Sequence, residues 1–230
     1  MNGELGVVAV TGGSSGLGDA VVHAVLQIGG SPVVIDIKRP RVDVDFELVD
    51  LADGRAAEAV VRRIGERYGR LDGLVTAAGV DECGPLASVD PMAWERVVAV
   101  NLLGTAAVTR AAIPYLELTA NGHIVTIAST LGIRAARDAT AYCASKFGVV
   151  GFTRALAAEL SGRVGVTLIV PGGMDTNFFD GRSEKYRPPS DMKLNDPANV
   201  AVCVVFALRQ PHGSEVRELI VTPSVDPSYP

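Results

Sequence analysis

The chain has 230 residues, of which 48% are hydrophobic, and this composition excludes an intrinsically disordered protein. The formal net charge of −5 argues against a nucleic-acid-binding surface, so we expect no nucleic-acid partner. No uninterrupted apolar run reaches the ~20 residues that a membrane-spanning helix needs, so we also expect no membrane partner.

The first predicted elements are a strand at 6–11, a glycine-rich turn at 11–18 and a helix at 16–29. This arrangement aims free backbone N–H groups at a phosphate, and glycine lets a pyrophosphate approach the backbone. The spacing is G-x-x-x-G-x-G rather than the commoner G-x-G-x-x-G, and such a turn alone is weak evidence. With suitable elements on both sides, it predicts dinucleotide binding by Gly12, Ser14, Ser15, Gly16, Leu17 and Gly18.

A second predicted strand at 32–36 ends on Asp36, eighteen positions after Gly18. A carboxylate at this place accepts hydrogen bonds from the adenosine ribose and repels a 2′-phosphate, so Asp36 favours NAD over NADP. Lys38 and Arg39 follow closely and soften that preference, which leaves NADP open. The segment 37–46 is too short and too rich in Pro and Asp for a full crossover helix.

The rest of the chain alternates apolar strand-like runs with helical stretches, the pattern of a parallel sheet covered on both faces. Further strands are predicted near 46–49, 72–76, 122–128, 164–170 and 217–221. Further helices are predicted near 53–68, 91–118, 139–161 and 197–209. Pro114 should bend or interrupt the third helix. We expect a single α/β domain, 1–230, with a doubly wound, Rossmann-like parallel sheet.

Tyr142 and Lys146 stand four positions apart in a predicted helix, so their side chains share one face. A phenol normally titrates near pH ~10, and a neighbouring ammonium group lowers its pKa. Bringing that pKa to about 7 requires roughly 4 kcal/mol of differential stabilisation. Tyr and Lys at this spacing are common in helices, so a structural role stays open on this evidence. Ser129, thirteen positions upstream of Tyr142, supports a catalytic role.

Together these residues resemble the short-chain dehydrogenase/reductase family over nearly the whole chain. The motifs that carry the resemblance are Thr11-Gly12-x-x-x-Gly16-x-Gly18, Asp50-Leu51, Ala78-Gly79, Asn101, the set Ser129, Tyr142 and Lys146, and Pro171-Gly172. The family's Asn-Asn-Ala-Gly segment appears here as Thr76-Ala77-Ala78-Gly79. The chain therefore lacks the two asparagine side chains that usually brace the central strands. The family's usual C-terminal ending is also replaced, by 222–230.

The resemblance implies an oxidoreductase in which Tyr142 is the general acid and base at the substrate oxygen. Ser129 would hold that oxygen, Lys146 would lower the pKa of Tyr142 and bind the nicotinamide ribose, and Asn101 would anchor a water. The additional cofactor-binding residues implied are Asp50, Leu51, Ala77, Ala78, Gly79, Asn101, Tyr142, Lys146, Pro171, Gly172, Met174 and Thr176.

The substrate is expected to contact Ser129, Leu131, Arg134, Tyr142 and Gly172. Two arginines between Ser129 and Tyr142, at 134 and 137, suit an anionic substrate, whereas Asp81 and Glu82 argue against one. Asp138 is an alternative local partner for either arginine. The segment 175–196 breaks the alternation of elements and follows the Pro-Gly pair, so we predict a substrate lid there.

The leading hypothesis is hydride transfer between NAD and an alcohol or ketone metabolite. The alternatives are an NADPH-dependent 3-oxoacyl-thioester reductase and a catalytically silent nucleotide-sensing scaffold. The resemblance also implies a homodimer or homotetramer packed through 91–118 and 139–161. The scattered Cys and His residues show no metal-ligand spacing, so no metal site is expected. The N-terminus lacks a basic leader, which favours a cytoplasmic protein.

Overall fold

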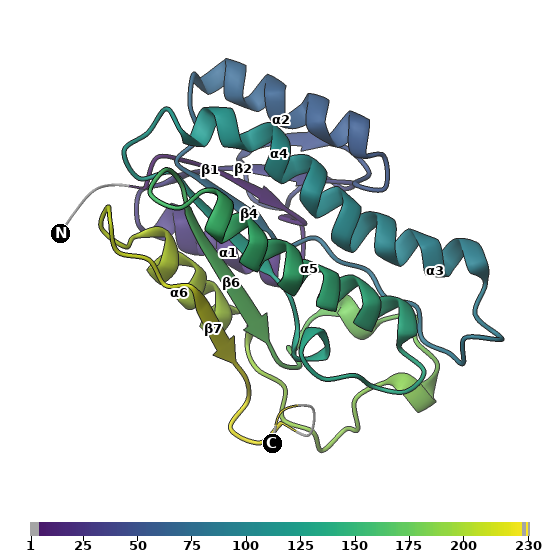
Figure 1. Ribbon diagram of the computed structural model, residues 1–230. Coiled ribbons are helices and arrows are strands. Elements are labelled where there is room, and N and C mark those ends of the chain that lie inside the picture. The colour runs from purple at the N-terminus through teal and green to yellow at the C-terminus, as the bar shows by residue number, and fades with distance from the viewer. Residues whose placement is uncertain (1–4, 227–228, 230) are drawn as a thin grey trace.

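The computed structural model describes residues 5–226 and 229. Its centre is a sheet of seven parallel strands in the order β3-β2-β1-β4-β5-β6-β7. The strands are Val7–Thr11 (β1), Ser31–Asp36 (β2), Asp45–Leu48 (β3), Gly73–Thr76 (β4), His123–Ile127 (β5), Gly165–Pro171 (β6) and Glu218–Val221 (β7). The doubly wound, Rossmann-like parallel sheet expected from the sequence is confirmed (Figure 1).

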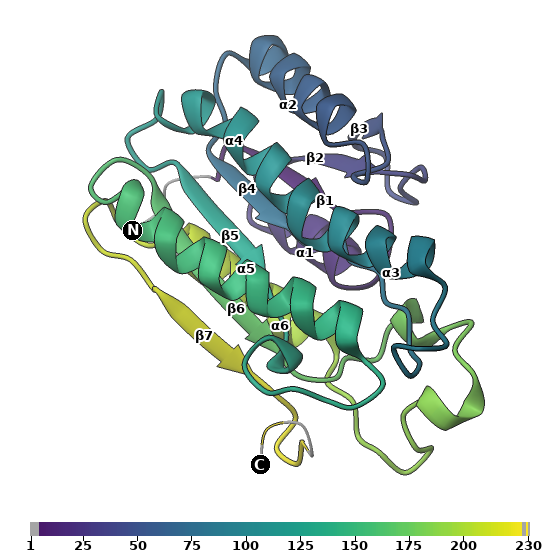
Figure 2. The ribbon, with the colours of Figure 1, turned by 45° about the vertical axis from the view of Figure 1, so that its right-hand side comes forward.

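Helices cover both faces of this sheet (Figures 1 and 2). They are Gly16–Gln27 (α1), Gly54–Tyr68 (α2), Pro91–Val98 (α3), Thr105–Leu116 (α4), Thr140–Glu159 (α5) and Pro197–Leu208 (α6). The α1 and α6 helices pack together on one face, while α2, α4 and α5 lie on the other. Alternate strand residues therefore enter two apolar layers, with Val8 and Val10 on the α1 side and Ala9 on the α2 side.

The segment between β2 and β3 contains no helix, as the sequence predicts. Residues 37–44 form an irregular loop, and β3 is the short strand at that edge of the sheet. The end of the sheet beside Asp36 is therefore covered by a loop rather than by a packed helix.

Pro114 does not interrupt the helix, so that part of the prediction is wrong. The helix passes through Pro114 and ends at Leu116, and the α-helical pattern is instead interrupted by the π-helical segment Ala99–Gly104. Pro114 removes only the one hydrogen bond to the carbonyl four residues earlier, and the helix ends two residues after it. The π-helical segment carries Asn101, and such segments occur frequently at functional sites.

Among the described residues, the helical stretch Pro91–Leu116 is long and apolar enough to cross a membrane by length and composition. However, 56% of its most apolar window is buried inside the fold, as in the core helix of a folded domain. It packs against α2 on one side and through its π-helical segment against α5. The stretch therefore gives only weak evidence for a membrane segment.

Candidate active site

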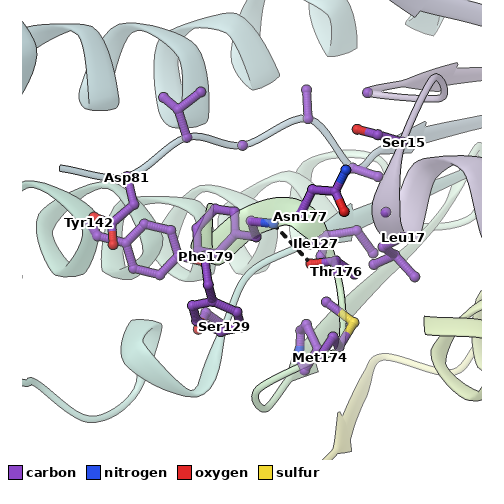
Figure 3. A pocket seen from close by; sticks show the side chains of 18 of the residues that line it. Ser15, Leu17, Asp81, Ile127, Ser129, Tyr142, Met174, Thr176, Asn177 and Phe179 are labelled. Carbon is purple, nitrogen blue, oxygen red and sulfur yellow. Dashed lines mark hydrogen bonds between the residues drawn. The ribbon is translucent and has the colours of Figure 1, made fainter. Parts of the chain in front are cut away.

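A cavity of about 910 Å³ opens where the strands of the sheet end at their carboxyl sides. The strand order reverses between β1 and β4, and ligands of open α/β sheets bind at this switch point. Figure 3 looks into the cavity, with Ser15 and Leu17 of the glycine-rich turn at one end and Tyr142 and Asp81 at the other. The cavity thus joins the predicted phosphate site to the predicted catalytic residues.

The glycine-rich turn needs glycine at particular places. Gly12 and Gly16 have φ angles of +70° and +53°, which side-chain-bearing residues rarely adopt. A Cβ on Gly12 would lie 2.7 Å from the Cα of Ala78. Gly18 does not line the cavity, but a Cβ there would overlap the carbonyl oxygen of Gly12. Gly18 therefore lets α1 pack on the turn, and the turn presents open backbone that fits a pyrophosphate.

Asp36 lies at the end of β2 and lines the cavity. Its carboxylate accepts hydrogen bonds from the backbone N–H groups of Ser14 and Lys38, each at 3.0 Å. The Ser14 hydroxyl in turn donates to the carbonyl oxygen of Lys38 at 2.6 Å. Arg39 is exposed and stacks over the Phe46 ring at 4.8 Å. The carboxylate is thus held in place, with two basic side chains at its border.

Asp50 and Leu51 line the same end of the cavity as Asp36, as expected. Asp50 forms an ion pair with Arg96 of α3 at 2.9 Å. The backbone N–H of Ala52 and then Arg96 hold the pKa of Asp50 below its usual value, against the effect of burial. Arg96 and Arg41 also line the cavity. Sequence reasoning missed both, because no spacing connects them to the motifs.

The loop after β4 is braced without the two usual asparagines. The backbone N–H of Ala78 donates to the Thr11 hydroxyl at 3.2 Å. The Asn101 side chain accepts from the N–H of Val80 at 2.8 Å and donates to its carbonyl at 2.9 Å. It also donates to the Ser145 hydroxyl at 3.0 Å. Asn101 is buried outside the cavity lining, so its side chain braces this loop instead of facing the cavity.

Ser129, Tyr142 and Lys146 converge at the floor of the cavity. Ser129 follows β5, and its hydroxyl accepts from the N–H of Leu131 at 3.1 Å and hydrogen-bonds Tyr142. Tyr142 and Lys146 lie on the first turns of α5, as their spacing predicts. The Lys146 ammonium group lies 5.6 Å from the Tyr142 ring centre and donates to the Ile127 carbonyl at 2.9 Å.

The expected lowering of the Tyr142 pKa is wrong for this structure. Burial raises the pKa of the Tyr142 phenol above its usual value, and the hydrogen bond from Ser129 opposes this only in part. Burial likewise lowers the pKa of Lys146 to about 8. The ammonium group points to the Ile127 carbonyl rather than to the phenol oxygen. How completely these groups are buried cannot be predicted from the sequence alone.

The segment 175–196 folds across the mouth of the cavity. Its base is closed by a pair of hydrogen bonds, from the Asp175 N–H to the Asn195 carbonyl and from the Asn195 N–H to the Gly173 carbonyl, both at 2.9 Å. Phe178 packs on Tyr142 with ring centres 5.5 Å apart. Met174, Thr176 and Phe179 also line the cavity (Figure 3). The segment therefore lies where the predicted lid would lie.

Two acidic residues tie this segment to the body. Arg182 forms an ion pair with Asp81 at 2.7 Å. Lys185 and Tyr186 donate to the Asp138 carboxylate at 3.1 and 3.0 Å. Asp138 has a φ of +59°, and it precedes α5 by two residues. Sequence reasoning placed Asp138 beside an arginine, and the structure shows Lys185 and Tyr186 as closer partners than Arg137.

The predicted substrate residues divide into two groups. Leu131 and Gly172 line the cavity, together with Ser129 and Tyr142. Arg134 is exposed and stacks over the Tyr229 ring at 5.1 Å, so the structure does not bring it to the cavity. The remaining expected cofactor residues that line the cavity are Ala77, Ala78, Gly79 and Pro171.

No cluster of three or more potential metal-ligating side chains occurs in the part of the chain that the structure describes. Cys83 donates to Asp81 at 3.2 Å, and burial raises the pKa of its thiol to about 12. All three cysteines are free.

Residues 6–187 match the family model described as short chain dehydrogenase. A 3-oxoacyl-[acyl-carrier-protein] reductase of Thermotoga maritima is 31% identical over 218 residues, 87% of this chain and 89% of that protein. The ligand-free aldohexose dehydrogenase of Thermoplasma acidophilum has a TM-score of 0.87 at 25% identity, covering 95% of this chain and 93% of that chain. An alcohol dehydrogenase of Thermococcus sibiricus, complexed with 5-hydroxy-NADP, has a TM-score of 0.83 at 22% identity, covering 95% and 96%.

Proposed function

The chain belongs to the short-chain dehydrogenase family of NAD(P)-dependent oxidoreductases, and on that premise we propose that it transfers a hydride between NAD and an alcohol or ketone metabolite. The observation that carries this proposal is the meeting of Ser129, Tyr142 and Lys146 in one cavity with the glycine-rich turn. The cofactor residues present fit a dinucleotide, because glycine leaves the backbone of the turn open to a phosphate.

In the proposed reaction the bound nicotinamide carries the hydride, and the protein manages orientation and protons. Tyr142 donates a proton to the substrate oxygen in reduction and removes it in oxidation. The Ser129 hydroxyl holds the same oxygen, and Lys146 would bind the ribose hydroxyls. A phenol titrates near pH ~10 and burial raises the pKa of Tyr142 further, so the phenol is protonated at neutral pH, which is the form that reduction requires.

Asp36 supports NAD as the preferred cofactor. Its carboxylate is fixed by two backbone N–H groups at the end of β2, where a 2′-phosphate would meet a negative charge. The test compares NADH with NADPH at equal concentrations in the wild type and in Asp36→Ala. We expect the wild type to prefer NADH and the variant to lose that preference. A strong wild-type preference for NADPH would overturn this assignment.

A second candidate is an NADPH-dependent 3-oxoacyl-thioester reductase. It is favoured by the Thermotoga maritima relative, which carries a reductase of that kind in its name. Lys38, Arg39 and Arg41 line the adenosine end of the cavity and supply positive charge for a 2′-phosphate. Reduction of a 3-oxoacyl thioester with NADPH, faster than reduction of simple ketones with NADH, would favour this candidate.

A catalytically silent scaffold is the third possibility, and turnover separates it from the other two. A screen of alcohols, hydroxy acids and diols with NAD would identify the substrate class. Tyr142→Phe keeps the buried ring and removes only the hydroxyl, so we expect turnover to fall by about 10²–10⁴-fold without loss of folding. Full activity in Tyr142→Phe would exclude the proposed mechanism.

We further infer that 1–230 forms one domain whose lid is 175–196, and that the protein works in the cytoplasm. Its family relationship supports assembly into a homodimer or homotetramer. The α5 helix carries an exposed row of small residues, including Ala144 and Gly151, and a second copy of α5 would approach closely there.

A further inference from the structure

A buried ion pair joins the lid to the loop after β4 beside the catalytic tyrosine. The Arg182 guanidinium group donates to the Asp81 carboxylate at 2.7 Å. The two side chains are only 16% and 5% exposed, and both residues line the cavity. Figure 3 shows Asp81 beside Tyr142 at the catalytic end. This pair is therefore part of the wall that a substrate meets.

The position of each partner is fixed by further contacts. Asp81 also accepts hydrogen bonds from the Glu82 N–H at 2.7 Å and from the Cys83 thiol at 3.2 Å. The Arg182 guanidinium group stacks over the Phe178 and Phe179 rings, 4.9 and 4.7 Å from their centres. Phe178 in turn packs on Tyr142. The guanidinium group is thus held near the reacting oxygen among aromatic rings.

A guanidinium group in such a place would ordinarily recognise a substrate carboxylate, because it binds carboxylates in a two-pronged geometry. Here Asp81 already fills that position. A substrate carboxylate would have to displace Asp81 and leave a buried charge without its partner, which is strongly unfavourable. The pair also leaves no net charge on this part of the wall.

We propose that Asp81 is a specificity-determining residue, which cancels the charge of Arg182 and restricts the pocket to substrates that are uncharged near the reacting carbon. This inference rests on the proposed function, and it deepens it by naming the substrate class as neutral alcohols and ketones. The aromatic rings of Phe178 and Phe179 suit an apolar or ring-shaped flank on such a substrate.

The test measures binding rather than turnover, with three ring compounds of similar shape: neutral benzamide, anionic benzoate and cationic benzamidine. Dissociation constants are measured by calorimetry for the wild type, Asp81→Asn, Arg182→Gln and the double variant. Asp191→Asn is the matched control, because it removes one negative charge from an exposed lid position outside the cavity lining.

We expect the wild type to bind benzamide more tightly than either charged compound. Asp81→Asn should shift the benzoate-to-benzamide affinity ratio by at least about tenfold towards benzoate. The double variant and Asp191→Asn should lack that shift. Arg182→Gln, which leaves the Asp81 carboxylate uncompensated, should shift the ratio towards benzamidine, so the inference stays testable if Asp81→Asn does not fold.

An unchanged ratio in folded Asp81→Asn would overturn the inference, and so would undetectable benzoate binding or a shift that persists in the double variant. If Asp81→Asn does not fold, an unshifted benzamidine ratio in Arg182→Gln overturns it. Turnover is measured separately with NADH and neutral ketones. Active enzyme with no ratio shift would refute only this inference, whereas a shift in an inactive protein would refute only the proposed function.

Discussion

Lys146 donates a hydrogen bond from its ammonium group to the carbonyl oxygen of Ile127, the last residue of β5, at 2.9 Å. The contact links α5 to the end of the sheet. It uses one of the three N–H donors of the Lys146 ammonium group. Lys146 also lines the cavity, together with Tyr142. Lys146 therefore has a structural partner in addition to its proposed role at the ribose.

The charge of Lys146 should control cofactor binding at alkaline pH. Because burial lowers its pKa to about 8, the ammonium group loses its proton as the pH rises through that value. We expect the KM for NAD to increase above pH 8, and steady-state kinetics from pH 6 to 10 would measure this. A KM that stays constant across that range would contradict the assignment.

Replacing Lys146 should make the protein more stable and less active. Below pH 8 the folded state carries a buried ammonium group, which lowers the free energy of unfolding. The unfolded chain keeps its proton up to the ordinary Lys pKa of 10.5, so the free energy of unfolding rises as the pH increases from about 8 towards 10.5. Lys146→Met removes the charge, so we expect the free energy of unfolding at pH 7 to increase by about 1–2 kcal/mol after the lost Ile127 contact is counted. Denaturant unfolding at pH 7 tests this, and a less stable variant would contradict it.

Gly18 should be intolerant of even one added carbon. Gly18→Ala places a Cβ against the backbone of Gly12, so we expect a loss of about 1–3 kcal/mol of stability and a higher KM for the cofactor. Gly54→Ala is the control, because its Cβ would meet only Ala107 at an ordinary 3.5 Å. Thermal unfolding of both variants separates the local clash from a general effect of replacing glycine. Equal stability of Gly18→Ala and Gly54→Ala would argue against close packing of Gly18 on the Gly12 carbonyl.

Acid should destabilise the protein through His123, which is buried at the start of β5 and hydrogen-bonded to Thr167 at 2.8 Å. Burial lowers the pKa of His123 to about 4 from its ordinary 6.5. Between these values the unfolded chain binds more protons, so stability falls as the pH drops from 6.5 to 4, by up to about 3 kcal/mol. Denaturant unfolding at several pH values in this window should show that the free energy of unfolding falls less steeply with falling pH in His123→Gln than in the wild type. The exposed His212→Gln should retain the wild-type slope.

The proposed assembly predicts that bulk on the outer face of α5 weakens association. Gly151 is exposed, and a Cβ there would meet nothing within 4 Å inside one copy of the chain. Gly151→Leu should therefore fold normally and shift the light-scattering mass towards the monomer. Gly162 lies beyond the end of α5 and has a φ of +76°, so Gly162→Asn serves as a control away from that face. An unchanged mass for Gly151→Leu would place the interface elsewhere.

The sequence predicted most of the fold because its signals are local. Apolar runs locate the strands, and the Tyr142–Lys146 spacing locates one face of α5. The Asp81–Arg182 pair spans 101 positions, so no spacing rule reveals it. The direction of the Tyr142 pKa shift could not be predicted either, because it depends on burial of the phenol, to which Phe178 contributes from a distant part of the chain.

The loop at 37–44 carries side chains at the adenosine end of the cavity that can be changed without altering a helix or strand. Its residues belong to no helix, and the side chains of Lys38, Arg39 and Arg41 are exposed. Exchanging these three basic residues would therefore alter cofactor choice, whereas Val42 and Val44 of the same loop pack on the α1 side of the sheet and would be kept. Redesign of the enzyme for a different reductant would begin at these basic residues and leave Ser129, Tyr142 and Lys146 unchanged.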